Sequence, residues 1–228
     1  MAQASKVIAV TGVTSGLGAA MTQFFTRHSH LVVGCGRTNL KIEELNSKYG
    51  SNRFHVVDVS KNNEVEHWVR QIIADFGVPD ILINNASIAN KTSKFWRVPP
   101  EDFDNAIDIN IKGVANALRH FLPHMVKAKR GIVVNMSAAW GKSVSPGVSA
   151  YCASKFAIEG FSKAVASELP DPLACVPLDP GVINTPMLQK IFGNAAAKQQ
   201  TPDTWVEKAG PMILDINRTV NGKSLKVK

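Results

Sequence analysis

The chain has 228 residues and a formal net charge of +8, with 45% hydrophobic and 19% charged residues. This composition is typical of a folded globular protein. It excludes a disordered chain, and no apolar run is long enough for a membrane-spanning helix. The basic residues are scattered and are not interleaved with aromatics, so we expect neither nucleic acid nor a membrane as a partner. An anionic small molecule would be an adequate partner for part of the positive charge.

The cysteines, the histidines and the N-terminus predict a cytoplasmic protein without a metal centre. Cys35, Cys152 and Cys175 are widely spaced and form no Cys-x-x-Cys pair, which indicates reduced core thiols. His120 and His124 have the spacing of a helical metal pair, but a proline separates them and no acidic third ligand is near. The N-terminus lacks the pattern of a secretory signal.

Short apolar runs alternate with segments of helical periodicity along the whole chain. Nearly continuous Val and Ile runs predict strands that are buried on both faces, as parallel strands are. The sequence therefore predicts one domain over 1–228: an α/β, doubly wound (Rossmann) fold with a mostly parallel sheet of about seven strands flanked by helices. Pro177 predicts a short or bulged last central strand, because proline cannot donate to a ladder. The predicted strands are 7–11, 31–35, 53–57, 81–84, 132–136 and 174–178, and the predicted helices are 17–28, 39–48, 63–76, 102–127 and 150–169.

The turn after the first predicted strand has the sequence TGVTSGLG at 11–18. Gly12 permits a tight turn, Gly16 lets the backbone approach a pyrophosphate, and Gly18 allows close packing. The free N–H groups of the following helix favour an anion. The pattern predicts a dinucleotide site, and a plain strand–helix turn is the alternative. Further cofactor contacts are expected from Thr14, Ser15 and Leu17.

The residues after the second and third predicted strands bear on the choice of cofactor. Gly36 is followed by Arg37 and Thr38, so this position has a guanidinium and no carboxylate. Arg37 can pair with a 2′-phosphate, which favours NADP(H) over NAD(H); the alternative is a solvated residue at a helix start. Asp58 could accept a hydrogen bond from the adenine amino group or cap the following helix.

Tyr151 and Lys155 lie four residues apart in the sequence YCASK, and Ser137 lies fourteen residues upstream. A free phenol has a pKa of about 10. We expect the Lys155 ammonium to lower the pKa of Tyr151, which then exchanges a proton with a carbonyl substrate. Ser137 is expected to donate a hydrogen bond to the substrate oxygen. The alternative is an amphipathic helix start with a solvated lysine.

Together, these motifs resemble the classical short-chain dehydrogenase/reductase family. In chain order, the glycine loop is followed by Asp58-Val59, Asn84-Asn85-Ala86, Asn110, Ser137, Tyr151, Lys155 and the stretch 180–185. The resemblance implies that Asn110 joins Ser137, Tyr151 and Lys155 in the catalytic set, where it holds a water that links Lys155 to solvent. The alternative for Asn110 is a polar side chain that satisfies nearby backbone. The cofactor contacts that the resemblance implies are Val59, Asn85, Ala86, Tyr151, Lys155, Pro180, Gly181, Val182 and Thr185.

The resemblance also bears on substrate and assembly. Longer stretches, such as 102–105 and 112–116, resemble members that reduce pterin-6-aldehydes in folate salvage. They imply NADPH-dependent reduction of an aromatic aldehyde, with Tyr151 as general acid. The alternatives are reduction of other small ketones, dicarbonyls or quinones, or an NADPH-binding sensor or scaffold without turnover. A homodimer or homotetramer is expected through 102–127 and 150–169. The expected substrate contacts are Ser137, Trp140, Tyr151 and Met187, although Trp140 could instead be a core or interface residue.

Three features depart from the family pattern. Ser87 stands where the family usually has glycine, and its side chain could crowd the nicotinamide side of the site. Asp179 replaces the usual asparagine before Pro180-Gly181. The chain is also somewhat short at its C-terminal end, where the family often completes its substrate pocket.

Overall fold

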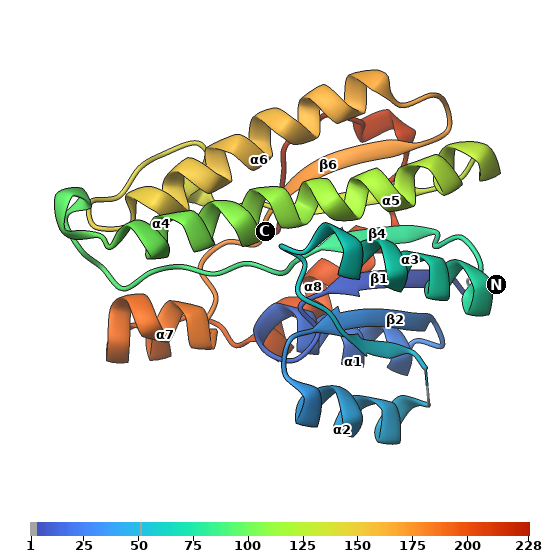
Figure 1. Ribbon diagram of the computed structural model, residues 1–228, viewed down its shortest axis with the longest axis horizontal. Helices are drawn as coiled ribbons and strands as arrows, with labels where there is room; N and C mark the ends of the chain where they lie inside the picture. The colour runs from blue at the N-terminus through green and yellow to red at the C-terminus, as the bar shows by residue number, and fades with distance from the viewer. Residues whose placement is uncertain (1–3, 51) are drawn as a thin grey trace.

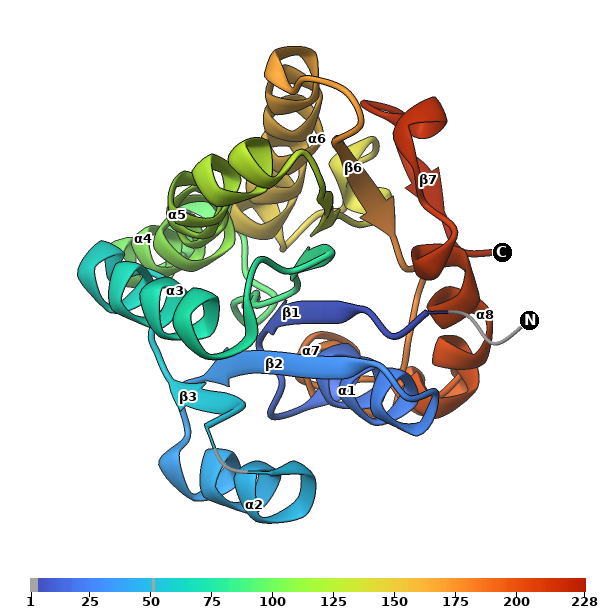
Figure 2. The same cartoon turned by 90° about the vertical axis from the view of Figure 1, so that its right-hand side faces the viewer.

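Seven strands form one sheet in the computed structural model, which describes residues 4–50 and 52–228. The strands are β1 (Val7–Thr11), β2 (Leu31–Gly36), β3 (Phe54–Val56), β4 (Ile81–Asn84), β5 (Ile132–Met136), β6 (Ala174–Asp179) and β7 (Leu225–Lys226). Their spatial order is β3-β2-β1-β4-β5-β6-β7, and every neighbouring pair is parallel. The predicted doubly wound parallel sheet is confirmed, because helices cover both of its faces (Figure 1, Figure 2).

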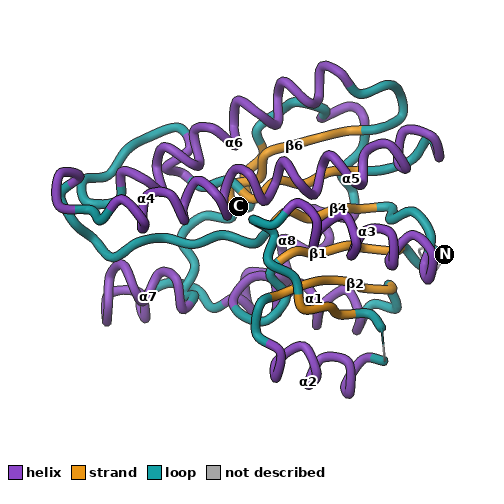
Figure 3. Tube along the Cα trace, viewed as in Figure 1, coloured by secondary structure: helices purple, strands orange, loops and turns teal. Residues whose placement is uncertain are grey.

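Helices alternate with the strands along the chain and form two layers (Figure 2, Figure 3). They are α1 (Gly16–Arg27), α2 (Asn39–Tyr49), α3 (Asn62–Phe76), α4 (Pro100–Ile107), α5 (Gly113–Ala128), α6 (Ser149–Glu168), α7 (Pro186–Phe192) and α8 (Pro202–Leu214). Ile8 and Val10 of β1 pack in the core beneath α1 and α8, whereas Ala9 packs in the core beneath α3, α5 and α6. Successive strand residues point to opposite faces, so a strand covered on both sides is apolar throughout.

The helix predicted over 102–127 contains a π-helical turn. α4 ends at Ile107, the π turn covers Asp108–Lys112, and α5 begins at Gly113. Asn110 lies in this turn and is buried. Such turns within α-helices occur frequently at functional sites.

β6 continues through Pro177, so the predicted shortening or bulge is wrong. The strand has six residues, all buried. The carbonyl oxygen of Leu178 accepts a hydrogen bond from the Ser137 nitrogen (2.8 Å), which places the backbone groups of Leu178 on the β5 side. Neighbouring residues of a strand face opposite partners, so the nitrogen of Pro177 faces the β7 side, where β7 begins only at the level of Leu178. The missing N–H of Pro177 therefore removes no hydrogen bond between β5 and β6.

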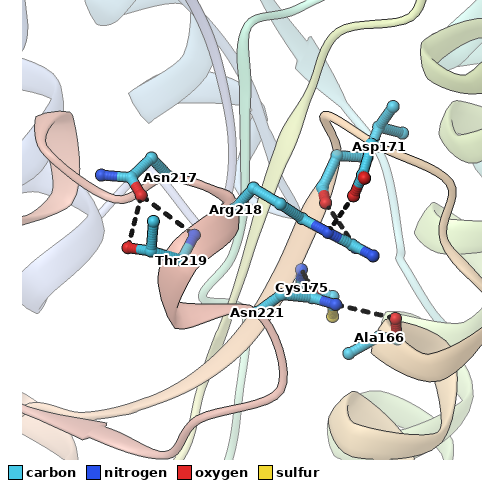
Figure 4. A network of polar contacts seen from close by, with 8 residues as sticks. Ala166, Asp171, Cys175, Asn217, Arg218, Thr219 and Asn221 are labelled. Atoms are coloured by element: carbon cyan, nitrogen blue, oxygen red, sulfur yellow. Dashed lines mark hydrogen bonds and ion pairs between the residues drawn. The ribbon is translucent and has the colours of Figure 1, made fainter.

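β7 lies at the edge of the sheet and belongs to a short C-terminal segment. This strand was not predicted from the sequence. The Arg218 guanidinium pairs with the Asp171 carboxylate. The Asn221 side chain donates to the Ala166 carbonyl (2.9 Å) and accepts from the Cys175 nitrogen (2.9 Å) (Figure 4). These contacts fasten the segment to α6 and β6 and so fix the position of β7.

None of the helices within residues 4–50 and 52–228 combines the length and the hydrophobicity that a bilayer crossing needs. The same residues contain no group of three or more His, Cys, Asp or Glu side chains placed to hold a metal ion. All three cysteines are buried free thiols, as the sequence predicted.

Candidate active site

A cleft of about 660 Å³ lies at the carboxyl ends of the strands, where the chain order reverses between β1 and β4. Doubly wound sheets bind their ligands at such a reversal. The walls are the loops after β1, β2, β4, β5 and β6, together with α7. The predicted residues that line it are Gly12, Thr14, Ser15, Gly16, Leu17, Arg37, Thr38, Asp58, Val59, Asn85, Ala86, Ser137, Trp140, Tyr151, Lys155, Pro180, Gly181, Val182, Thr185 and Met187.

Gly18 and Asn110 are the predicted site residues that do not line the cleft. A Cβ atom on Gly18 would lie 2.0 Å from the Gly12 carbonyl oxygen, so Gly18 supports the loop from behind. The Asn110 side chain accepts from the Ile88 nitrogen (2.8 Å) and donates to the Ile88 carbonyl (2.9 Å) and to the Ser154 hydroxyl (3.0 Å). Asn110 therefore satisfies nearby backbone and holds the loop after β4. Its water-binding role remains a prediction.

The loop between β1 and α1 can cradle an anion. Gly12 and Gly16 have φ angles of +75° and +56°, a region that favours glycine. A Cβ atom on Gly12 would lie 3.0 Å from the Ala86 Cα atom, so a larger residue would crowd the loop after β4. The first turn of α1 begins at Gly16 and lines the cleft, and its N–H groups have no partner within the helix.

Asn85 and Thr11 fasten this glycine loop to β4. The Thr11 hydroxyl accepts from the backbone nitrogens of Asn85 and Ala86, both at 3.0 Å. The Asn85 side-chain amide donates to the carbonyl oxygens of Thr11 (2.9 Å) and Gly12 (3.1 Å). The side chain of Asn85 thus shapes the loop that would hold the cofactor phosphates.

The end of β2 brings positive charge to the cleft. Arg37 is exposed and lines the cleft, as does Lys41, one turn into α2, which the sequence analysis did not identify. Asp58 also lines the cleft, but its Oδ1 atom accepts from the nitrogen (3.0 Å) and hydroxyl (2.8 Å) of Ser60. The predicted capping of the following helix is wrong, because the N-cap of α3 is Lys61 and no side chain caps it; Asp58 instead holds the turn before the helix, and its contact with adenine remains a prediction.

Tyr151 and Lys155 meet in the cleft, but their electrostatics differ from the prediction. The Lys155 Nζ atom lies 5.3 Å from the Tyr151 ring centroid and donates to the Met136 carbonyl oxygen (2.8 Å). Burial lowers the pKa of Lys155 to about 8. Burial also raises the pKa of the Tyr151 phenol, with smaller contributions from Asp179 and Cys152. The predicted lowering of the Tyr151 pKa is thus wrong, because burial disfavours the phenolate and the Lys155 ammonium donates to a backbone carbonyl.

Ser137 is engaged with a residue that the sequence analysis missed. Its hydroxyl is buried and donates to the Oε1 atom of Glu159 on α6 (2.7 Å). The Ser224 hydroxyl, next to β7, donates to the same oxygen (3.1 Å). Glu159 follows Lys155 by four residues on the buried face of α6, a spacing that could have revealed it.

Aromatic side chains of the cleft lining lie close together at α7. The Trp140 ring contacts Tyr151 edge-on, with centroids 6.1 Å apart, and lies 5.9 Å from the ring of Phe192 at the end of α7. Figure 1 shows α7 beyond the carboxyl ends of the strands. The Ser87 hydroxyl is buried at the cleft wall with no hydrogen-bond partner among the described residues. Asp179 accepts from the Gly181 nitrogen (2.9 Å) and so shapes the turn after β6.

Comparison with known proteins identifies the family. The sequence model of the short chain dehydrogenases matches residues 6–196. The chain belongs to the short-chain dehydrogenase family. A relative of this short-chain dehydrogenase is the NADPH-dependent pterin aldehyde reductase of Arabidopsis thaliana, 48% identical over 227 residues, which are 98% of this chain and 94% of that protein.

Solved structures of other reductases and dehydrogenases share the fold. The 3-ketoacyl-(acyl-carrier-protein) reductase of Brucella melitensis, complexed with NADH, has a TM-score of 0.89 at 27% identity and covers 97% of this short-chain dehydrogenase and 96% of its own chain. A serine dehydrogenase complexed with NADP+ has a TM-score of 0.88 at 26% identity, with 96% and 93% covered. Family and fold therefore agree with the prediction from the motifs.

The buried lysine of this short-chain dehydrogenase should make its stability depend on pH. The pKa of Lys155 falls from 10.5 to about 8 on folding. Between these pH values the unfolded chain binds a proton that the folded protein does not, so the free energy of unfolding rises with pH. Lys155→Met removes this contribution. The free energy of unfolding of the wild type should therefore rise by about 2–3 kcal/mol relative to that of Lys155→Met between pH 7 and pH 10.

Urea unfolding of both proteins at the two pH values measures this change. Lys163→Met is the matched control, because Lys163 is an exposed lysine on the same helix. A difference between wild type and Lys155→Met that stays constant from pH 7 to pH 10 would contradict the depressed pKa.

Proposed function

We propose that this short-chain dehydrogenase uses NADPH to reduce the carbonyl of an aromatic aldehyde, such as a pterin-6-aldehyde, to the alcohol, with Tyr151 as general acid. The observation that carries the proposal is the 48% identity over 98% of the chain to the Arabidopsis NADPH-dependent pterin aldehyde reductase. Tyr151 and Lys155 face one cleft with the glycine loop and Arg37, which supports the same conclusion.

The residues of the cleft fit NADP(H). The glycine loop and the first turn of α1 would hold the pyrophosphate, since any Cβ on Gly12 would press against Ala86. Arg37, assisted by Lys41, would pair with the 2′-phosphate; a carboxylate there would repel it. Lys155 would hold the nicotinamide ribose hydroxyls, and Thr185 the carboxamide. When bound, the reduced nicotinamide supplies a hydride to the carbonyl carbon.

Tyr151 supplies the proton that balances this hydride. A phenol of ordinary pKa is protonated at neutral pH, and burial raises the pKa of Tyr151 further, so the phenol holds a proton that it can donate to a carbonyl oxygen. As the oxygen gains negative charge, the phenolic proton passes to it and the alcohol forms. The Lys155 ammonium, 5.3 Å from the ring centroid, stabilises the phenolate left behind. Trp140 and Phe192 offer flat apolar surfaces against which an aromatic substrate can lie.

The substrate can be assigned by following the loss of NADPH absorbance with a panel of carbonyl compounds. We expect pterin-6-aldehyde to be reduced with the highest kcat/KM, and turnover with NADH in place of NADPH to be at least tenfold slower, which corresponds to about 1.4 kcal/mol. Faster turnover of small ketones, dicarbonyls or quinones would favour a reductase of another substrate class. NADPH binding without turnover of any compound would favour a sensor or scaffold.

Assembly and location remain predictions. A homodimer or homotetramer would pair through α5 and α6, which lie side by side on one face of the sheet (Figure 1, Figure 2). The cytoplasm is the expected compartment.

A further inference from the structure

Glu159 is a buried carboxylate behind the catalytic serine, and the mechanism above gives it no role. It is 5% exposed and lies on α6 four residues after Lys155, which itself follows Tyr151 by four. Residues at this spacing share one face of a helix. The face of α6 that presents the phenol and the ammonium to the cleft therefore also carries a carboxylate, which lies behind the cleft lining.

Only one of the two oxygens of this carboxylate accepts hydrogen bonds from the described residues. Its Oε1 atom accepts from the Ser137 hydroxyl at 2.7 Å and from the Ser224 hydroxyl at 3.1 Å. Its Oε2 atom is buried and has no hydrogen-bond partner among the described residues. A buried acid with an unsatisfied oxygen costs stability, and an apolar side chain of similar volume would avoid that cost. A role in the site explains why the position is acidic.

The backbone leaves room for the Ser137–Glu159 contact. A Cβ atom on Gly141 would lie 2.7 Å from the Ser137 Oγ atom and 3.0 Å from the Glu159 Cγ atom. Any side chain at Gly141 would therefore push the two groups apart. On the far side, Ser224 precedes β7, whose segment is fastened to α6 and β6 through Asn221 (Figure 4). The carboxylate thus joins the catalytic serine to an anchored part of the C-terminal segment.

We propose that Glu159 is a positioning residue: its carboxylate accepts a hydrogen bond from the Ser137 hydroxyl and so holds the Ser137 side chain in one orientation at the wall of the cleft. The inference rests on the proposed function, because it gives this orientation a use in carbonyl reduction. The donation of Ser137 to a substrate oxygen, for which the hydroxyl would turn from Glu159 toward the carbonyl, remains a prediction.

Two neutral replacements of similar size test the proposal. Glu159→Gln keeps an acceptor oxygen for Ser137, whereas Glu159→Met fills the same volume without one. We expect Glu159→Met to lower kcat by about tenfold to a hundredfold, the range of a hydrogen bond to a charged group, with the KM for NADPH unchanged. Glu159→Gln should recover most of the lost kcat. Glu168→Met is the matched control, because Glu168 is exposed on the same helix and should leave kcat unaltered.

A double-mutant cycle shows whether Glu159 acts through Ser137. In a Ser137→Ala background, Glu159→Met should cause no further loss of kcat. Wild-type kcat in Glu159→Met, the same loss in both backgrounds, or a Glu159→Gln enzyme as slow as Glu159→Met would overturn the proposal. Glu159→Leu serves as a second apolar replacement if Glu159→Met does not fold.

The same four proteins separate this inference from the proposed function. A cycle of unfolding free energies between Ser137→Ala and Glu159→Met needs no substrate, and it should show coupling between the two positions. If the wild type reduces no carbonyl compound, the proposed function fails while this coupling still reports on the contact. If the wild type is active and the coupling is absent, the inference about Glu159 fails alone.

Discussion

Tyr151→Phe should slow carbonyl reduction by about 10²–10⁴-fold, the usual contribution of a positioned general acid, and leave NADPH binding nearly unchanged. The substitution removes only the hydroxyl group. The ring remains to contact Trp140, whose centroid lies 6.1 Å away, and the Lys155 Nζ atom keeps its bond to the Met136 carbonyl. The loss should therefore appear in kcat, because the proton can no longer reach the developing alkoxide.

Turnover is followed by NADPH absorbance and cofactor binding by calorimetry. Tyr49→Phe is the natural control, since Tyr49 is the only other tyrosine of the chain, packs against the core and does not line the cleft. Turnover in Tyr151→Phe equal to that of the wild type would reject Tyr151 as the acid. A variant that no longer binds NADPH would instead give the phenol a mainly structural role in the cofactor site.

Much of the fold could be predicted because strand and helix periods are local properties of the chain. The prediction 7–11 matches β1, and 132–136 matches β5. β7 was missed because it has only two residues, too few to show an apolar period. The effect of Pro177 also could not be judged from the sequence, because it depends on which neighbouring strand its nitrogen faces.

The site residues could be predicted where the sequence spacing within a motif sets the relative positions of its residues. The glycine spacing and the Tyr151–Lys155 turn brought the expected residues into one cleft. The direction of the Tyr151 pKa shift could not be predicted, since it depends on burial that only the folded chain creates. The role of Glu159 was missed because it depends on a hydrogen bond of 2.7 Å from Ser137, which is 22 positions away in the sequence.

Arg37→Glu should weaken NADPH binding by about tenfold to a hundredfold while leaving NADH binding unchanged or improved. Arg37 lies directly after β2 and lines the cleft, and Lys41 is the nearest other cation in that wall along the chain. A charge-assisted hydrogen bond contributes about 1.5–3 kcal/mol, and this range sets the expected loss. A carboxylate at the same position would repel a 2′-phosphate but could accept a hydrogen bond from a ribose 2′-hydroxyl.

Calorimetric titration of both nucleotides at low and high salt measures the change in preference. The difference between wild type and Arg37→Glu should narrow at high salt, because the exposed guanidinium is screened. Lys208→Glu is the control: Lys208 is exposed on α8, outside the cleft, and its replacement makes the same change in net charge. If the ratio of NADPH to NADH affinity is the same in Arg37→Glu as in the wild type, Arg37 does not read the 2′-phosphate, and Lys41 becomes the residue to test.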